Sequence, residues 1–154
     1  MSDSKNKELM FRISEIRKIS HFENDFHDYG LKEKDLVNIT FKLHLGLEID
    51  CDKNKISQRV KCTFHNDSND EQQLFGIETI TSFILKNFDN VVTKKDCDEY
   101  NVPDGLLELF LDISMSHTRG MLAALNTNSI YQKTILPLVD PKEILKNSNI
   151  QKVG

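Results

Sequence analysis

The chain has 154 residues, of which 38% are hydrophobic and 29% are charged, with no tryptophan and a formal net charge of −4. A chain of this size typically forms one domain, which buries about 70% of the surface that is exposed in the unfolded state. The negative charge argues against a nucleic-acid partner, because binding phosphates needs clustered lysine and arginine. The composition therefore predicts a single globular domain.

Membrane and metal sites are not predicted. No window approaches the about 18 to 20 apolar residues of a membrane span, and the N-terminus lacks the apolar stretch of a signal peptide, so we expect a cytoplasmic protein without direct membrane insertion. Cys51, Cys62 and Cys97 are odd in number and lack the spacing of a zinc site. They are interpreted as reduced structural thiols, and neither a metal nor a cofactor is expected.

Strands are predicted first along the chain. Residues 1–8 are polar and expected to be disordered, and residues 9–150 are expected to form the domain. The apolar spacing from Phe11 to Phe22 begins as a strand and then fits either a β-bulge or a helical spacing, and the segment is interpreted as a strand. Residues 37–49 alternate apolar and polar side chains without interruption, which predicts a long strand with one buried face.

Two more strands complete the predicted sheet. After the turn CDKN, residues 56–64 alternate again, so an antiparallel hairpin is expected. Residues 72–85 form the fourth strand, in which the apolar parity shifts between Ile77 and Ile80 and predicts a second bulge. The polar segment 86–101 is interpreted as a long loop.

A long helix is predicted from Pro103 to about Asn126. Its apolar side chains cover roughly 220° of the helix, whereas packing on one sheet needs an arc of a little over ~100°. Another copy of the chain is the expected cover for the excess, and a C-terminal segment that folds back is the alternative. The sequence around Asp140 and Pro141 marks the start of a short second helix.

Strands that precede helices are typical of an α+β fold. We expect a four-stranded antiparallel sheet with a long and a short C-terminal helix on one face.

Reactive residue types cluster in the segment SHTRG of the long helix. Ser116 and His117 are adjacent and point about 100° apart, which does not suit a nucleophile and its base. Gly120 costs about 1 kcal/mol relative to alanine in mid-helix, which close packing of another backbone would explain. No catalytic residue is predicted, and an oligomer interface is expected at Ser116, His117, Arg119 and Gly120. A small-molecule-binding or enzymatic domain that uses His117 and Arg119 is an alternative.

With these elements in order, the chain resembles the SecB export-chaperone family over roughly residues 9–146. The segment MFRISEIRKISHFEN resembles the opening strand of the family, and the strands ITFKLHLGLEID, VKCTFH and LFGIETITSFIL follow in the family's order. SMSHTRGML and TILPLVDPKEIL take the places of its Y-A-R-containing helix, its L-x-P-V connection and its last helix. The C-P-N-I motif of the family is replaced by GLLELFLD.

The resemblance implies a holdase chaperone that assembles as a homotetramer, a dimer of dimers with the long helices at the interface. In the family, unfolded preproteins bind in extended form in apolar grooves and are kept soluble for export, while an acidic sheet face docks on the translocase motor ATPase SecA. Glu23 and Glu78 match acidic positions of that face. A SecB-like chaperone dedicated to one partner, such as an antitoxin, is the alternative function.

Apolar side chains that lie off the main core pattern or near the predicted bulge are the candidates for the peptide groove. A client gains about 25 cal/mol per Å² of apolar surface that it buries there, and backbone hydrogen bonds add affinity that does not depend on sequence. For each candidate, ordinary core packing is the alternative interpretation. The candidates are Phe22, Phe75, Ile80, Phe83, Phe110 and Met115.

Overall fold

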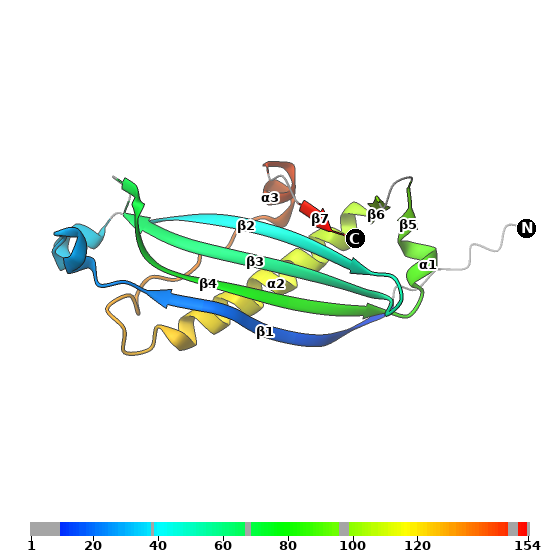
Figure 1. The fold of residues 1–154 in the computed structure, drawn as a ribbon, viewed down its shortest axis with the longest axis horizontal. Coiled ribbons are helices and arrows are strands. Elements are labelled where there is room, and N and C mark those ends of the chain that lie inside the picture. Colours follow the sequence, from blue (N-terminus) through cyan, green and yellow to red (C-terminus); the bar gives the residue numbers. More distant parts are fainter. Residues whose placement is uncertain (1–9, 38, 67–68, 96–98, 148–150, 154) are drawn as a thin grey trace, which may run out of the picture.

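The computed structural model describes residues 10–37, 39–66, 69–95, 99–147 and 151–153, so the expectations for residues 1–8 and Cys97 lie outside the described chain. Four long strands form an antiparallel sheet in the order β1-β4-β3-β2, and a short fifth strand, β7, pairs parallel with β2 (Figure 1). The strands are β1 (Phe11–Glu23), β2 (Ile39–Asp50), β3 (Lys55–Asn66), β4 (Asn69–Leu85) and β7 (Gln151–Val153).

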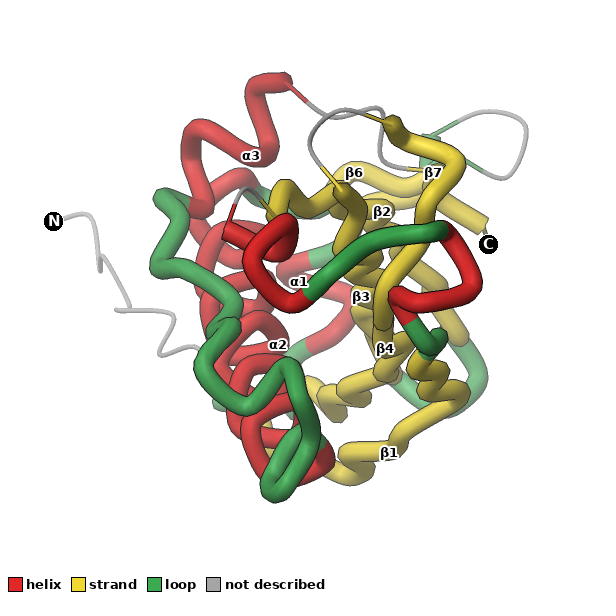
Figure 2. The backbone as a smooth tube through the Cα atoms, turned by 90° about the vertical axis from the view of Figure 1, so that its left-hand side faces the viewer, coloured by secondary structure: helices red, strands yellow, loops and turns green. Residues whose placement is uncertain are grey.

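Two C-terminal helices, α2 (Asp104–Leu125) and α3 (Pro141–Asn147), lie on the same side of this sheet (Figure 2). The Asp140 carboxylate accepts a hydrogen bond of 2.9 Å from the Lys142 backbone N–H at the start of α3. This contact confirms the aspartate cap that the sequence predicts. The α+β class and the four-stranded antiparallel sheet are confirmed as well.

Shorter elements connect the layers. After β1 come the 3₁₀ helices η1 (Phe26–Tyr29) and η2 (Glu33–Val37). The predicted polar loop at 86–101 instead contains α1 (Phe88–Val91) and the two-stranded pair β5 (Thr93–Lys94) and β6 (Tyr100–Asn101). The loop prediction was wrong there because Phe88 and Val92 are isolated apolar residues that both enter the core, at 3% and 5% exposure.

The predicted bulge in β4 is wrong. β4 pairs with β3 in unbroken register from Phe75 to Ile84. Thr79 and Thr81 occupy positions that face α2, and the Thr79 hydroxyl lies 2.8 Å from the Thr118 hydroxyl. The apparent shift of parity arises because hydroxyls replace apolar groups at these two positions. The irregularity predicted in β1 is confirmed, since its register with β4 shifts between Ile13 and Glu15 and again between Lys18 and Ser20.

The core between sheet and helix forms two clusters. In the first, the Phe75 ring stacks on Phe64 and on Tyr131, with centroid distances of 4.3 and 4.6 Å. In the second, the Phe83 and Phe110 rings stack at 3.9 Å. These aromatic contacts fix α2 and the segment after it on the sheet. We call the sheet side that faces α2 the helix face and the opposite side the outer face.

Gly76 lies on the outer face in close contact with its neighbours. A Cβ at this position would be 2.5 Å from Phe22 Cε1 and 2.8 Å from the Cys62 carbonyl oxygen. Since a backbone atom cannot move aside easily, Gly76→Ala is expected to destabilise the chain by about 1–3 kcal/mol, measured by urea unfolding. Gly120→Ala is the control, because nothing lies within 4 Å of its Cβ position and alanine is expected to add about 1 kcal/mol in a helix. Equal stability of the two variants would contradict the expectation.

Candidate functional site

The structure places most of the predicted groove residues inside the core. Five of them are between 0% and 5% exposed, because they pack between sheet and helix or beneath the side chains of the outer face; they are Phe75, Ile80, Phe83, Phe110 and Met115. These side chains hold the layers together and do not present a surface to a client. Phe22 is half-buried, with its ring against Gly76 on the outer face.

Three exposed aliphatic side chains lie instead along the connection between α2 and α3. Ile130, Ile135 and Leu138 are 54%, 61% and 87% exposed. Between them, Tyr131 and Leu136 are each 1% exposed and join the first core cluster. The connection is therefore anchored by buried side chains while its exposed ones point away from the core. Sequence reasoning missed this site, although the resemblance sets the segment TILPLV against the L-x-P-V connection of the family.

Tyr131 is a strong anchor of the connection. Its hydroxyl donates a hydrogen bond of 2.9 Å to the Asn24 carbonyl, beyond the end of β1. Burial, followed by the nearby charges of Glu23 and Asp25, raises the pKa of Tyr131 to about 12. The phenol therefore stays protonated at neutral pH and keeps its hydrogen bond.

Arg119 supplies a second anchor from α2. Its Nε donates a hydrogen bond of 2.9 Å to the Leu136 carbonyl, and its Nη2 donates one of 3.1 Å to the Pro137 carbonyl. The C-terminal segment therefore folds back on this flank of α2, which is the alternative that the wide apolar arc left open. The Arg119 guanidinium thus forms hydrogen bonds within its own chain, whereas the sequence suggested an oligomer contact.

The other predicted interface residues divide between open surface and internal contacts. Ser116 and Gly120 are exposed on α2, beside Leu109, which is 38% exposed. His117 is half-buried, and its Nδ1 lies 3.2 Å from the Thr81 hydroxyl of β4. Of the predicted interface residues, Ser116 and Gly120 are therefore the two that lie open to a partner.

Burial lowers the pKa of His117 below its ordinary value of 6.5. The unfolded chain therefore binds more protons than the folded chain once the pH falls below about 6.5, and stability falls with it. We expect the urea concentration at the midpoint of unfolding to be lower at about pH 5 than at about pH 8. The difference is expected to be smaller in His117→Gln, because the glutamine amide can bond Thr81 without titrating. An identical pH profile in both proteins would count against this role.

β1 presents a second row of exposed aliphatic side chains. It closes one edge of the sheet, since β4 is its one neighbour in the strand order of the described residues. An edge strand carries unpaired backbone donors and acceptors that can pair with another chain. The exposed side chains are Met10, Ile13, Ile16 and Ile19, with exposures of 46%, 41%, 44% and 36%.

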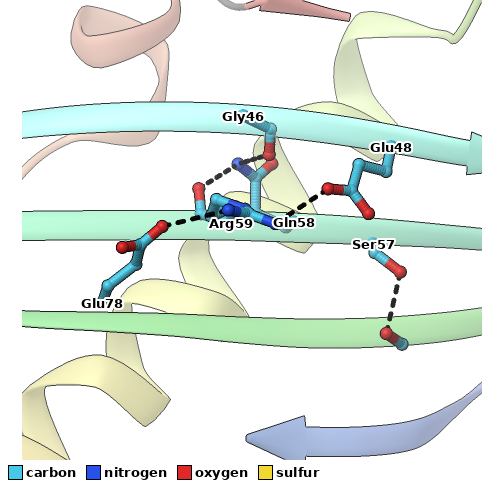
Figure 3. Close-up of polar contacts among 7 residues, drawn as sticks. Gly46, Glu48, Ser57, Gln58, Arg59 and Glu78 are labelled. Carbon is cyan, nitrogen blue, oxygen red and sulfur yellow. Dashed lines mark hydrogen bonds and ion pairs between the residues drawn. The ribbon is translucent and has the colours of Figure 1, made fainter. Parts of the chain in front are cut away.

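The outer face does not bring the two predicted docking residues together. Arg59 makes ion pairs with Glu78 at 3.2 Å and with Glu48 at 3.0 Å, across three neighbouring strands (Figure 3). Glu23 is instead paired in register with Phe75, a helix-face residue, and its carboxylate accepts a hydrogen bond of 2.8 Å from Ser129. Glu23 and Glu78 thus lie on opposite sides of the sheet, and Glu78 shares the Arg59 guanidinium with Glu48.

Within the described ranges, no group of three or more histidine, cysteine or acidic side chains is placed to hold a metal ion. Burial raises the pKa of the Cys62 thiol to about 12, which keeps it protonated and a poor nucleophile. No described helix is both long enough and apolar enough for a bilayer crossing.

A scan against models of protein families finds no match, and neither does a search of curated proteins. Among solved structures, the chain is similar to the SecB-like chaperone Rv1957 of Mycobacterium tuberculosis, solved in complex with a ChAD peptide from the antitoxin HigA1 (Rv1956). The TM-score is 0.52 at 10% sequence identity, and the match covers 84% of this chain and 90% of that chain. The similarity therefore establishes a SecB-like fold.

Proposed function

We propose that this protein is a holdase chaperone, which binds extended apolar segments of unfolded polypeptides and keeps them soluble without converting them chemically. The observation that carries the proposal is the exposed aliphatic set of the α2–α3 connection, Ile130, Ile135 and Leu138, on a SecB-like fold. Three large apolar side chains exposed within nine residues of one connection favour a surface that binds a partner.

The energetics suit reversible binding. Burying one such aliphatic side chain contributes about 1.5–3 kcal/mol, and a client must offset its own loss of conformational freedom. Contacts to two or three side chains then give moderate affinity and allow release. The specificity is broad, because apolar burial does not depend on direction or on an exact sequence.

Unfolded preproteins in the cytoplasm are the clients that we propose first. A single dedicated partner, such as an antitoxin, is the second candidate, because the similar Mycobacterium tuberculosis chaperone was solved with an antitoxin peptide. Docking to SecA is not part of the proposal, since Glu78 is paired with Arg59 and Glu23 lies on the other side of the sheet.

We propose that the chain assembles through β1. Antiparallel pairing of two copies of β1, centred on Ile16, would place Ile13 opposite Ile19 and Glu15 opposite Arg17. Both contacts occur twice around the two-fold axis, so apolar and opposite-charge pairs repeat. The exposed α2 stripe at Ser116 and Gly120 is then the second contact of a dimer of dimers.

The proposed function is tested by light scattering of the purified protein, alone and with a reduced, unfolded client. We expect an oligomer that forms a discrete complex and prevents the client from aggregating. A panel of unrelated clients and one antitoxin peptide separates the two candidates, because a dedicated chaperone protects one partner only. A protein that leaves every client to aggregate would exclude both.

A further inference from the structure

The stretch from Ile135 to Val139 carries two of the most exposed aliphatic side chains of the described chain but has little backbone support. Within the residues that the structure describes, its backbone forms no hydrogen bond with another backbone group, whereas the preceding turn is closed by a bond of 2.9 Å from the Thr134 N–H to the Tyr131 carbonyl. The two hydrogen bonds from Arg119 are the polar contacts that hold it. Apart from these, the buried Leu136 side chain and the half-buried Val139 side chain, which packs against the first core cluster, fix the stretch.

The two carbonyls that Arg119 holds separate the exposed side chains. Leu136 and Pro137 lie between Ile135 and Leu138, so fixing their carbonyls fixes the direction in which both neighbours project. A guanidinium is suited to this contact, because its planar fork can donate to two adjacent acceptors at once. Lysine, a compact point charge on a flexible stem, cannot reproduce that fork.

We infer that Arg119 is the positioning residue of the client site: it acts through the Leu136 and Pro137 carbonyls to hold Ile135 and Leu138 in the exposed geometry that an apolar client segment contacts. This inference rests on the proposed chaperone function. Preorganisation raises affinity because the ordering cost is met before the client arrives.

The same contacts define how the client is recognised. Pro137 has no backbone N–H, and the two carbonyls are already occupied by Arg119. These features reduce the number of backbone groups that the stretch can offer for strand addition, so the client is recognised mainly through its apolar side chains. A segment with several large aliphatic or aromatic residues fits this site, whereas its backbone pattern matters little.

Two substitutions test the inference. Arg119→Met keeps most of the apolar stem but removes both donors, and Arg119→Lys restores a charge and part of the hydrogen bonding. We measure the affinity for a fluorescent apolar peptide of a protected client, and the NMR order parameters of the Ile135 and Leu138 methyl groups. For Arg119→Met we expect affinity weakened about tenfold and more mobile methyl groups, with partial rescue of both by lysine.

Arg59→Met is the matched control. It removes an arginine with two ion pairs on the outer face and is expected to leave both peptide affinity and the two methyl groups unchanged. Wild-type affinity with rigid methyl groups in Arg119→Met would overturn the inference while the proposed function stands. If Arg119→Met does not fold, wild-type mobility and affinity in Arg119→Lys would overturn it instead. A wild-type protein that binds no client refutes the proposed function itself.

Discussion

Replacing Ile135 and Leu138 together by serine is expected to weaken client binding about 100-fold, which corresponds to about 3 kcal/mol. The two side chains are 61% and 87% exposed, so the folded chain loses little packing. Exposed substitutions typically change stability by less than about 0.5 kcal/mol. Fluorescence anisotropy with a peptide client measures the first effect, and urea unfolding measures the second.

Leu136→Ser is the matched control for this double variant. Leu136 lies between the two exposed residues but is 1% exposed within the first core cluster. The substitution is expected to destabilise the fold by about 2–5 kcal/mol, because it removes buried apolar volume. Client binding that survives in the double serine variant would show that the connection is not the client site.

The strands could be predicted because burial imposes a strict period of two. In β2, each residue from Ile39 to Asp50 pairs in unbroken register with β3, so the alternation in the sequence survives unchanged in the structure. β4 could not be predicted as well, since Thr79 and Thr81 point into the core where an apolar side chain was expected. Their partners, Thr118 and His117, lie on α2, and no local pattern indicates such pairs.

The candidate site was harder to predict than the fold for a related reason. Composition cannot distinguish Leu136, which is buried, from Leu138, which is almost fully exposed. The difference depends on contacts with residues distant in the sequence, such as the hydrogen bond from Tyr131 to Asn24, across 107 positions. The groove candidates of β4, such as Phe75 and Phe83, lie near an apparent shift of parity that instead marks the polar positions Thr79 and Thr81 of a regular strand.

Ile16→Lys is expected to convert the proposed oligomer to a smaller species by abolishing pairing between two copies of β1. Ile16 is 44% exposed on the edge strand, so the folded subunit can accept lysine at little cost. At the centre of a two-fold pairing, however, the substitution places two like charges directly opposite each other, which is destabilising. Light scattering is expected to show a halved mass, with unchanged urea stability once dissociation is accounted for.

A charge exchange tests the register of the same contact. Glu15→Arg alone would place arginine opposite Arg17 twice around the axis, and Arg17→Glu alone would place glutamate opposite Glu15 twice. Each single variant is therefore expected to dissociate the pair, while the double exchange restores opposite charges and the wild-type mass. The exchange also preserves the charge pair that Glu15 and Arg17 form within one strand. Assembly unaffected by all three variants would exclude β1 as the contact and leave the exposed stripe of α2 to hold the copies together.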